Sequence, residues 1–148
     1  MAYEFQVTVD AADPHTQADW WAQTLGWEVE PSDEEFIRRM ISAGHATDDD
    51  TTRHHGVLVW KEGAAIRHPD GLERAPRMLF LLVPEAKQVK NRMHPDVRVG
   101  ADSVPDVVAS LVARGASFLH EGRQGPQTWV TLADPEGNEF CVSGSAGT

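Results

Sequence analysis

The chain contains the same order of expected elements twice, and this repetition limits the folds that it can adopt. In the first copy, apolar and polar residues alternate over residues 5–10, as in a half-buried strand. A helical pattern follows and ends at Gly26, and another strand begins directly after this glycine. Gln6 lies 20 residues before Gly26, and in the second copy His94 lies 21 residues before Gly115. A strand–helix–glycine–strand unit therefore occurs twice.

Local signals mark where the two helices begin. Asp13 followed by Pro14 predicts the start of the first helix, because Asp is a favourable N-cap and Pro suits the first turn. Ser103 predicts the cap of the second helix. The apolar side of that helix is expected to consist of Val104, Val107, Val108, Leu111 and Val112.

Each copy continues into further strands. They are expected at residues 56–61, 64–68 and 78–83 in the first copy, and at residues 117–120, 128–133 and 139–143 in the second. We interpret residues 1–148 as one α+β domain of two βαβββ modules, module 1 over about residues 3–84 and module 2 over about residues 92–144.

The first copy also carries an insertion. Ser32 and Glu35 form the pattern of a capping box and predict an extra helix that Gly44 ends. The polar segment after it is expected to be a mobile loop. His54 and His55 in this loop look like part of a metal cluster, but adjacent histidines on a loop rarely converge on one ion. We therefore interpret them as solvated.

Composition excludes several classes of function. The 148 residues are 41% hydrophobic, enough for a core, and carry a net charge of -10 that disfavours nucleic acid and anionic lipid as partners. No apolar run approaches the roughly 18 residues of a membrane helix, and the N-terminal segment is unlike a secretory signal. The single cysteine, Cys141, excludes an internal disulfide. We expect a cytoplasmic protein.

The alternation of side chains sorts the strands into two faces. The apolar face, expected to pack under the helices, consists of Val7, Val9, Val97, Val99, Val130, Leu132, Phe140 and Val142. The polar face consists of Gln6, Thr8, Asp10, His94, Asp96, Arg98, Trp129, Thr131, Glu139, Cys141 and Ser143. Such a face is either solvated or the lining of a pocket. The His, Trp and Cys in the set favour a pocket.

Three stretches that together span nearly the whole chain resemble the vicinal oxygen chelate superfamily of glyoxalases, extradiol dioxygenases and bleomycin-resistance proteins. They are DAADPHTQADWWAQTLGWEVE, VPEAKQVKNRMHPDVRV and ARGASFLHEGRQGPQTWVTLADPEGNEFCV. The resemblance is greatest to the glyoxalase-like domain branch. It implies a curved, mixed, eight-stranded sheet around a small-molecule cleft, often within a homodimer.

The resemblance also implies positions for metal ligands. Gln6 and His94 match ligand positions of the metal-dependent members, whereas Cys141 stands where a glutamate is usual. The fourth position, around residues 80–82, is apolar. The implied metal site, Gln6, His94 and Cys141, is therefore incomplete. We expect no cofactor, and the alternative is a Zn, Ni or Fe ion bound by the thiolate.

Without a metal, the polar face still offers chemistry. His94 could act as a general acid or base whose pKa Asp96 influences. Arg98 could hold a carboxylate or phosphate, and Trp129 could stack on a planar ligand. Asp96 and Glu139 complete the predicted substrate-binding set. Structural roles stay open for each of them, such as an Arg98–Asp96 pair.

These observations lead to three hypotheses on function. The first is a lyase or isomerase that acts on a small oxygenated metabolite, with His94 as the catalytic residue and true glyoxalase I activity not expected. The alternative is a metal-free protein that binds or sequesters a ligand, as bleomycin-resistance relatives do. A vestigial cleft in a sensor or partner-binding module is a third interpretation. A homodimer is expected.

Overall fold

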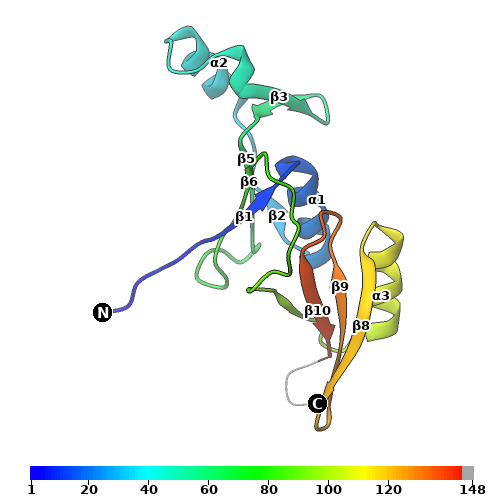
Figure 1. Cartoon of the computed structure of the whole chain (residues 1–148). Helices are drawn as coiled ribbons and strands as arrows, with labels where there is room; N and C mark the ends of the chain where they lie inside the picture. The colour runs from blue at the N-terminus through cyan, green and yellow to red at the C-terminus, as the bar shows by residue number, and fades with distance from the viewer. Residues whose placement is uncertain (145–148) are drawn as a thin grey trace. The chain divides into compact units, whose positions relative to one another are not determined.

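The computed structural model describes residues 1–144, which form two compact units, one from Met1 to Ala86 and one that begins at Lys87. Each unit contains one four-stranded mixed sheet and at least one helix (Figure 1). The α+β class and the two βαβββ modules are therefore confirmed. The eight strands of the repeat form two sheets of four.

In the first unit the strand order is β1-β6-β5-β2. The bounds are β1 Val7–Ala11, β2 Glu28–Val29, β5 Gly63–Arg67 and β6 Met78–Leu82. Strand β1 runs parallel to β6, and the other pairs are antiparallel. Helix α1, Pro14–Leu25, packs against β5 and β6.

The second unit repeats this topology with the order β7-β10-β9-β8. The bounds are β7 Asp96–Arg98, β8 Ser117–Gln124, β9 Gln127–Ala133 and β10 Glu139–Ser143, with helix α3 at Val104–Ala113. The first and last strands are again parallel neighbours, so the repeat seen in the sequence is a repeat of topology. Helix α3 packs against β10.

The predicted ends of both helices are confirmed. The Asp13 side chain accepts a hydrogen bond from Thr16 N at the start of α1, and Gly26 ends the helix with φ of 70°. The Ser103 side chain accepts a hydrogen bond from Asp106 N at the start of α3. The left-handed conformation at Gly26 is one that glycine adopts without steric penalty.

The cap of the inserted helix α2, Glu34–Ser42, differs from the prediction. Asp33, and not Ser32, accepts the hydrogen bond from Phe36 N. The Ser32 hydroxyl instead donates to the carbonyl of Leu58, at 3.3 Å. The helix therefore begins one residue later than predicted, at a residue type that is itself a favourable N-cap.

The expected mobile loop was also wrong. A 3-10 helix, η1, spans Asp48–Asp50, and β3, Thr51–His54, pairs with β4, Val57–Trp60, in an antiparallel hairpin. The two turn residues, His55 and Gly56, both have positive φ, of 50° and 78°. Such turns join hairpin strands because their twist matches that of the strands.

The core of each unit consists mainly of apolar side chains. In the first unit the largest fully buried side chains are Phe80, Ile37 and Ile66, together with polar Gln17, and in the second they are Phe140, Leu132 and Val142. None of the helices within residues 1–144 is long and apolar enough to cross a membrane.

Candidate functional site

The polar face of the second sheet carries most of the predicted site residues. Asp96 on β7 and Thr131 on β9 are the register partners of Cys141 on β10, so these three side chains share one face. Phe140 and Val142 alternate with Cys141 and are fully buried on the other face. The predicted division of these strands into an apolar and a polar face is confirmed.

His94, Asp96 and Cys141 come together on this face. Each offers one ligating atom, and these atoms all lie within 4.8 Å of one another. His94 Nδ1 lies 3.9 Å from Asp96 Oδ1, with the two side chains 40% and 60% exposed. His94 precedes β7 and does not belong to the strand, contrary to the prediction. The hydrogen bond from Cys141 N to the carbonyl of Pro95 holds the backbone beside it, at 3.0 Å.

The donor atoms of this cluster suit a borderline divalent cation. An imidazole nitrogen, a carboxylate oxygen and a thiolate sulfur are all ligands of Zn²⁺, and three protein ligands leave a position for water or substrate. A hard ion such as Mg²⁺ prefers an all-oxygen shell. Cys141 is half-buried, and its Sγ lies 3.4 Å from Thr131 Oγ1, a contact that orients the sulfur. These residues therefore fit the kind of ion that the resemblance implies, with Asp96 as an additional ligand.

Gln6, the other ligand that the resemblance implied, belongs to the first unit. It is exposed and immediately precedes β1. Its Oε1 accepts a hydrogen bond from Arg77 Nη1 at 3.1 Å, and Arg77 also forms an ion pair with Glu30. Within the first unit, Gln6 thus interacts with an arginine side chain.

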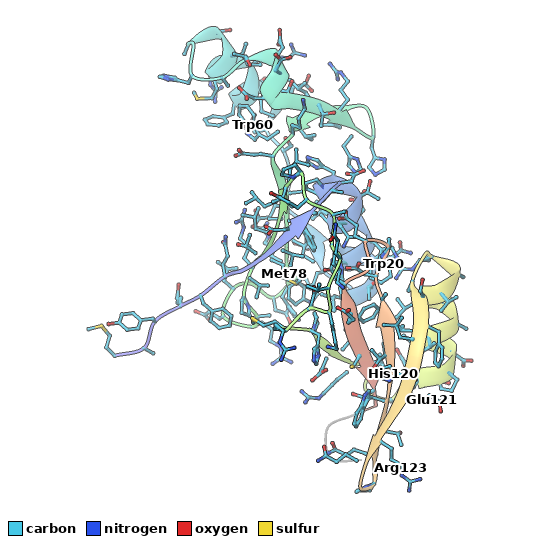
Figure 2. The ribbon with its side chains drawn as sticks, viewed as in Figure 1. Trp20, Trp60, Met78, His120, Glu121 and Arg123 are labelled. Atoms are coloured by element: carbon cyan, nitrogen blue, oxygen red, sulfur yellow. The ribbon has the colours of Figure 1, made fainter. Side chains whose placement is uncertain are left out.

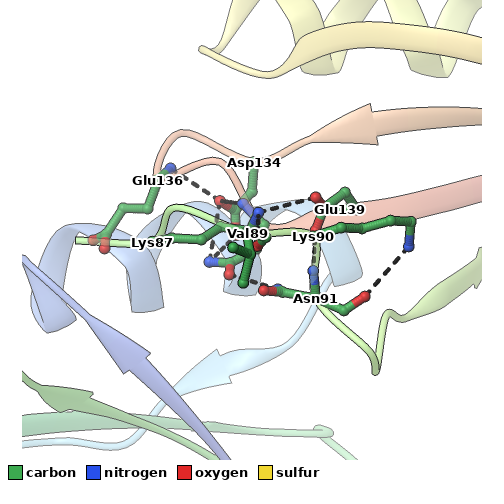
Figure 3. A network of polar contacts seen from close by, with 8 residues as sticks. Lys87, Val89, Lys90, Asn91, Asp134, Glu136 and Glu139 are labelled. Atoms are coloured by element: carbon green, nitrogen blue, oxygen red, sulfur yellow. Dashed lines mark hydrogen bonds and ion pairs between the residues drawn. The ribbon is translucent and has the colours of Figure 1, made fainter. Parts of the chain in front are cut away.

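Glu139 is held by a polar network at the start of β10 (Figure 3). Its carboxylate accepts hydrogen bonds from Lys87 Nζ at 2.9 Å and from Asn91 N at 3.1 Å. Asn91 Nδ2 also donates to Asn138 Oδ1, at 2.8 Å. Sequence reasoning missed Lys87 and Asn91, because their segment has neither helical nor strand periodicity. A role of Glu139 in substrate binding stays a prediction.

The network gives Glu139 an unusual pKa. Burial raises the pKa of its carboxyl group, but hydrogen bonds from Lys87 and from backbone N–H groups and the Lys87 charge together lower it more, from an ordinary 4.5 to about 2. A carboxyl group with a depressed folded-state pKa stabilises the fold above its unfolded pKa. This stabilisation is therefore lost as the pH falls from about 4.5 toward 2.

We expect Glu139→Gln to lower the free energy of unfolding at pH 7 by about 1–2 kcal/mol, allowing for solvent screening of the ion pair. The variant should also lose less stability than the wild type between pH 4.5 and 2. Urea unfolding at a series of pH values measures both effects. Glu121→Gln, at an exposed position of β8, is the control and should follow the wild type. An identical pH dependence in all three proteins would contradict the prediction.

Arg98 and Trp129 lie on the same face of the sheet but have different surroundings. Arg98 is exposed and forms no ion pair with any residue that the structure describes, so the predicted alternative of an Arg98–Asp96 pair is not observed. The indole of Trp129 lies directly on its register partner Gly122, where any larger side chain would collide with the ring. Gly122 thus positions Trp129.

His120 extends this face to β8 and was not among the predicted site residues. Its register partner is Thr131, which in turn is the partner of Cys141. A β-bulge lies between Phe118 and His120. Bulges re-aim side chains and are common beside active sites. Figure 2 shows His120 on β8, followed along the strand by Glu121 and Arg123.

A second cluster lies in the first unit. The side chain of His54, which was interpreted as solvated, is only 22% exposed, whereas that of His55 is 76% exposed, in line with the interpretation. Both imidazoles contact the carboxylate of Asp19 on α1. Little in the sequence indicated this contact, because Asp19 lies 35 and 36 residues before His54 and His55.

The topology and the polar sheet face define a protein of the vicinal oxygen chelate superfamily. The family model described as "Glyoxalase-like domain" matches residues 6–143, and the chain belongs to this family. A search of curated proteins finds no match.

Solved structures share the fold at low sequence identity. A mutant of the genomically encoded fosfomycin resistance protein FosX from Listeria monocytogenes, complexed with Mn(II) and 1S,2S-dihydroxypropylphosphonic acid, has a TM-score of 0.64 at 9% identity, over 99% of this chain and 95% of that one. Protein ATC0852 from Agrobacterium tumefaciens has a TM-score of 0.62 at 15% identity, over 99% and 100%. A putative glyoxalase from Bacillus halodurans has a TM-score of 0.57 at 13% identity, over 95% and 93%.

Proposed function

We propose that the protein is a metal-assisted lyase or isomerase that acts on a small oxygenated metabolite, with the ion bound by His94, Asp96 and Cys141. The observation that carries this proposal is the convergence of three ligating atoms within 4.8 Å on one sheet face. A structural relative that binds Mn(II) supports a divalent ion in this fold. When bound, such an ion would polarise a substrate oxygen as a Lewis acid.

Other residues of the same face would bind and orient the substrate. Arg98 is exposed and would hold a carboxylate or phosphate by a two-pronged contact. Trp129, supported by Gly122, offers an aromatic surface on the same face. With His94 as a ligand, His120 is the remaining imidazole of the face described and is our candidate for proton transfer.

The test is the absorption spectrum of Co²⁺ bound to the untagged protein. We expect a thiolate-to-cobalt charge-transfer band in the wild type and its loss in Cys141→Ser. His94→Ala should weaken binding at least about 100-fold, since loss of even an outer-shell partner of a metal ligand costs about 10–100-fold. His45→Ala, at an exposed position outside both clusters, is the control and should keep the band.

The alternative function is metal-free ligand binding on the same face, supported by the half-buried Trp129–Gly122 surface and by Arg98, which forms no ion pair with any described residue. A wild-type protein that shows no charge-transfer band with Co²⁺ would refute the metal-assisted proposal and favour this alternative. We also expect the protein to be a homodimer and to be located in the cytoplasm. Sedimentation of the untagged chain would test the homodimer.

A further inference from the structure

Two adjacent histidines and one aspartate converge in the first unit. His54 Nε2 lies 2.6 Å from Asp19 Oδ2, and His55 Nε2 lies 2.8 Å from the same oxygen. The ligating atoms of all three residues lie within 4.8 Å of one another. His54 and Asp19 are partly shielded from water, with side chains 22% and 37% exposed, whereas His55 is exposed.

The hairpin turn explains how adjacent histidines can reach one oxygen. Neighbouring residues of a regular strand point to opposite faces. His54 ends β3 as the register partner of Val57, and His55 is the first turn residue, with φ of 50°. This left-handed conformation costs a non-glycine residue free energy, and it turns the second imidazole toward the first. Their ring centroids are 4.0 Å apart.

His15 fixes the helix to the hairpin on the other side of the cluster. It lies one helical turn before Asp19, and its Nε2 donates a hydrogen bond to the carbonyl of Trp60 on β4 at 2.7 Å. Its ring centroid is 5.2 Å from that of His54. Two independent contacts, from His15 to β4 and from Asp19 to β3, therefore hold α1 and the hairpin in one arrangement.

We propose that Asp19, His54 and His55 form a second divalent-cation site, for Zn²⁺ or a similar borderline ion. Two imidazoles and one carboxylate are a donor set that Zn²⁺ accepts with a position left for water. Both histidines would bind the ion as neutral imidazoles through Nε2, the atoms that now contact Asp19 Oδ2. The ion would link α1 to the hairpin. This site shares no residue with the site on the second sheet and is independent of the proposed function.

The test isolates this site with the Cys141→Ser variant, in which the cluster of the second sheet lacks its sulfur ligand. We expect calorimetric titration of this untagged variant with Zn²⁺ to show binding that Asp19→Asn or His55→Asn weakens at least about 100-fold. His55→Asn is the sharper variant, because Asn tolerates positive φ and so preserves the turn. His45→Ala is the control and should bind as its parent does.

Two further readouts separate the two sites. Co²⁺ bound to Cys141→Ser should show d–d bands without a thiolate charge-transfer band, and His55→Asn should lose these bands. Zn²⁺ should raise the melting temperature of Cys141→Ser but not that of its His55→Asn derivative. The proposal is overturned if Cys141→Ser binds no Zn²⁺, or if the Asp19 and His55 variants bind it as tightly as their parent. Neither result would contradict the proposed metal site at His94, Asp96 and Cys141.

Discussion

Replacing Phe140 by alanine should lower the free energy of unfolding by about 3–5 kcal/mol, the usual cost of removing a fully buried aromatic side chain. Phe140 is 0% exposed, and its register partner Leu132 on β9 is equally buried. The ring lies on the face of β10 opposite Cys141, where α3 packs against this strand. Its loss would leave a cavity beneath the strand that carries the candidate site.

Phe118→Ala is the matched control, because this phenylalanine lies in the same sheet but is 54% exposed. Its removal should change the free energy of unfolding by no more than about 0.5 kcal/mol. Urea unfolding of the full chain, followed by circular dichroism, measures both variants. Equal losses in the two variants would mean that the helix-covered face of the sheet is not the core of the second unit.

The parts of the fold that could be predicted are those that local chemistry determines. Alternation along β10 places Phe140 and Val142 on one face and Cys141 on the other, whichever strands lie beside it. Ser103 and Gly26 act within their own helix ends, through a side-chain cap and a left-handed glycine. The repeat then follows because the same signals occur twice in the same order.

The hairpin of β3 and β4 could not be predicted, because its first strand has no apolar alternation. Thr51–His54 is polar throughout and gains its order by pairing with Val57–Trp60 and by contact with Asp19. Gly56 in the turn is a partial signal for a hairpin. The residue before it, His55, is not one of those that commonly precede glycine in such turns.

The sequence predicted several residues of the candidate site, but it did not predict which other residues they contact. Cys141, Asp96 and His94 were all placed on one face, and the structure brings their ligating atoms together. The partners of Glu139 were not foreseen, because Lys87 lies 52 residues away in the chain. Ion pairs between distant segments depend on tertiary packing, which no local periodicity encodes.

The turn between β9 and β10 determines where β10 begins, and a single carboxylate organises it. Asp134 Oδ1 accepts hydrogen bonds from Glu136 N at 2.9 Å and from Asn138 N at 3.0 Å. Asp134 N donates to the carbonyl of Asn138 at 2.8 Å, and Gly137 adopts φ of 91° between them. Asn138 also accepts the hydrogen bond from Asn91. The turn therefore supports the network that holds Glu139.

We expect Asp134→Ala to lower the free energy of unfolding by about 2–4 kcal/mol. Asp134 is only 3% exposed, so its loss would leave two backbone N–H groups without their charged acceptor at a site with little access to water. Asp134→Asn keeps an acceptor oxygen and should lose less, whereas Glu121→Ala, at an exposed position, should change stability by about 0.5 kcal/mol or less. Urea unfolding ranks the three variants. If Asp134→Asn were as damaging as Asp134→Ala, the charge of the carboxylate and not its hydrogen bonds would stabilise the turn. If neither variant lost stability, the turn would not depend on Asp134, and the position of Glu139 would have to be set by Lys87 and Asn91 alone.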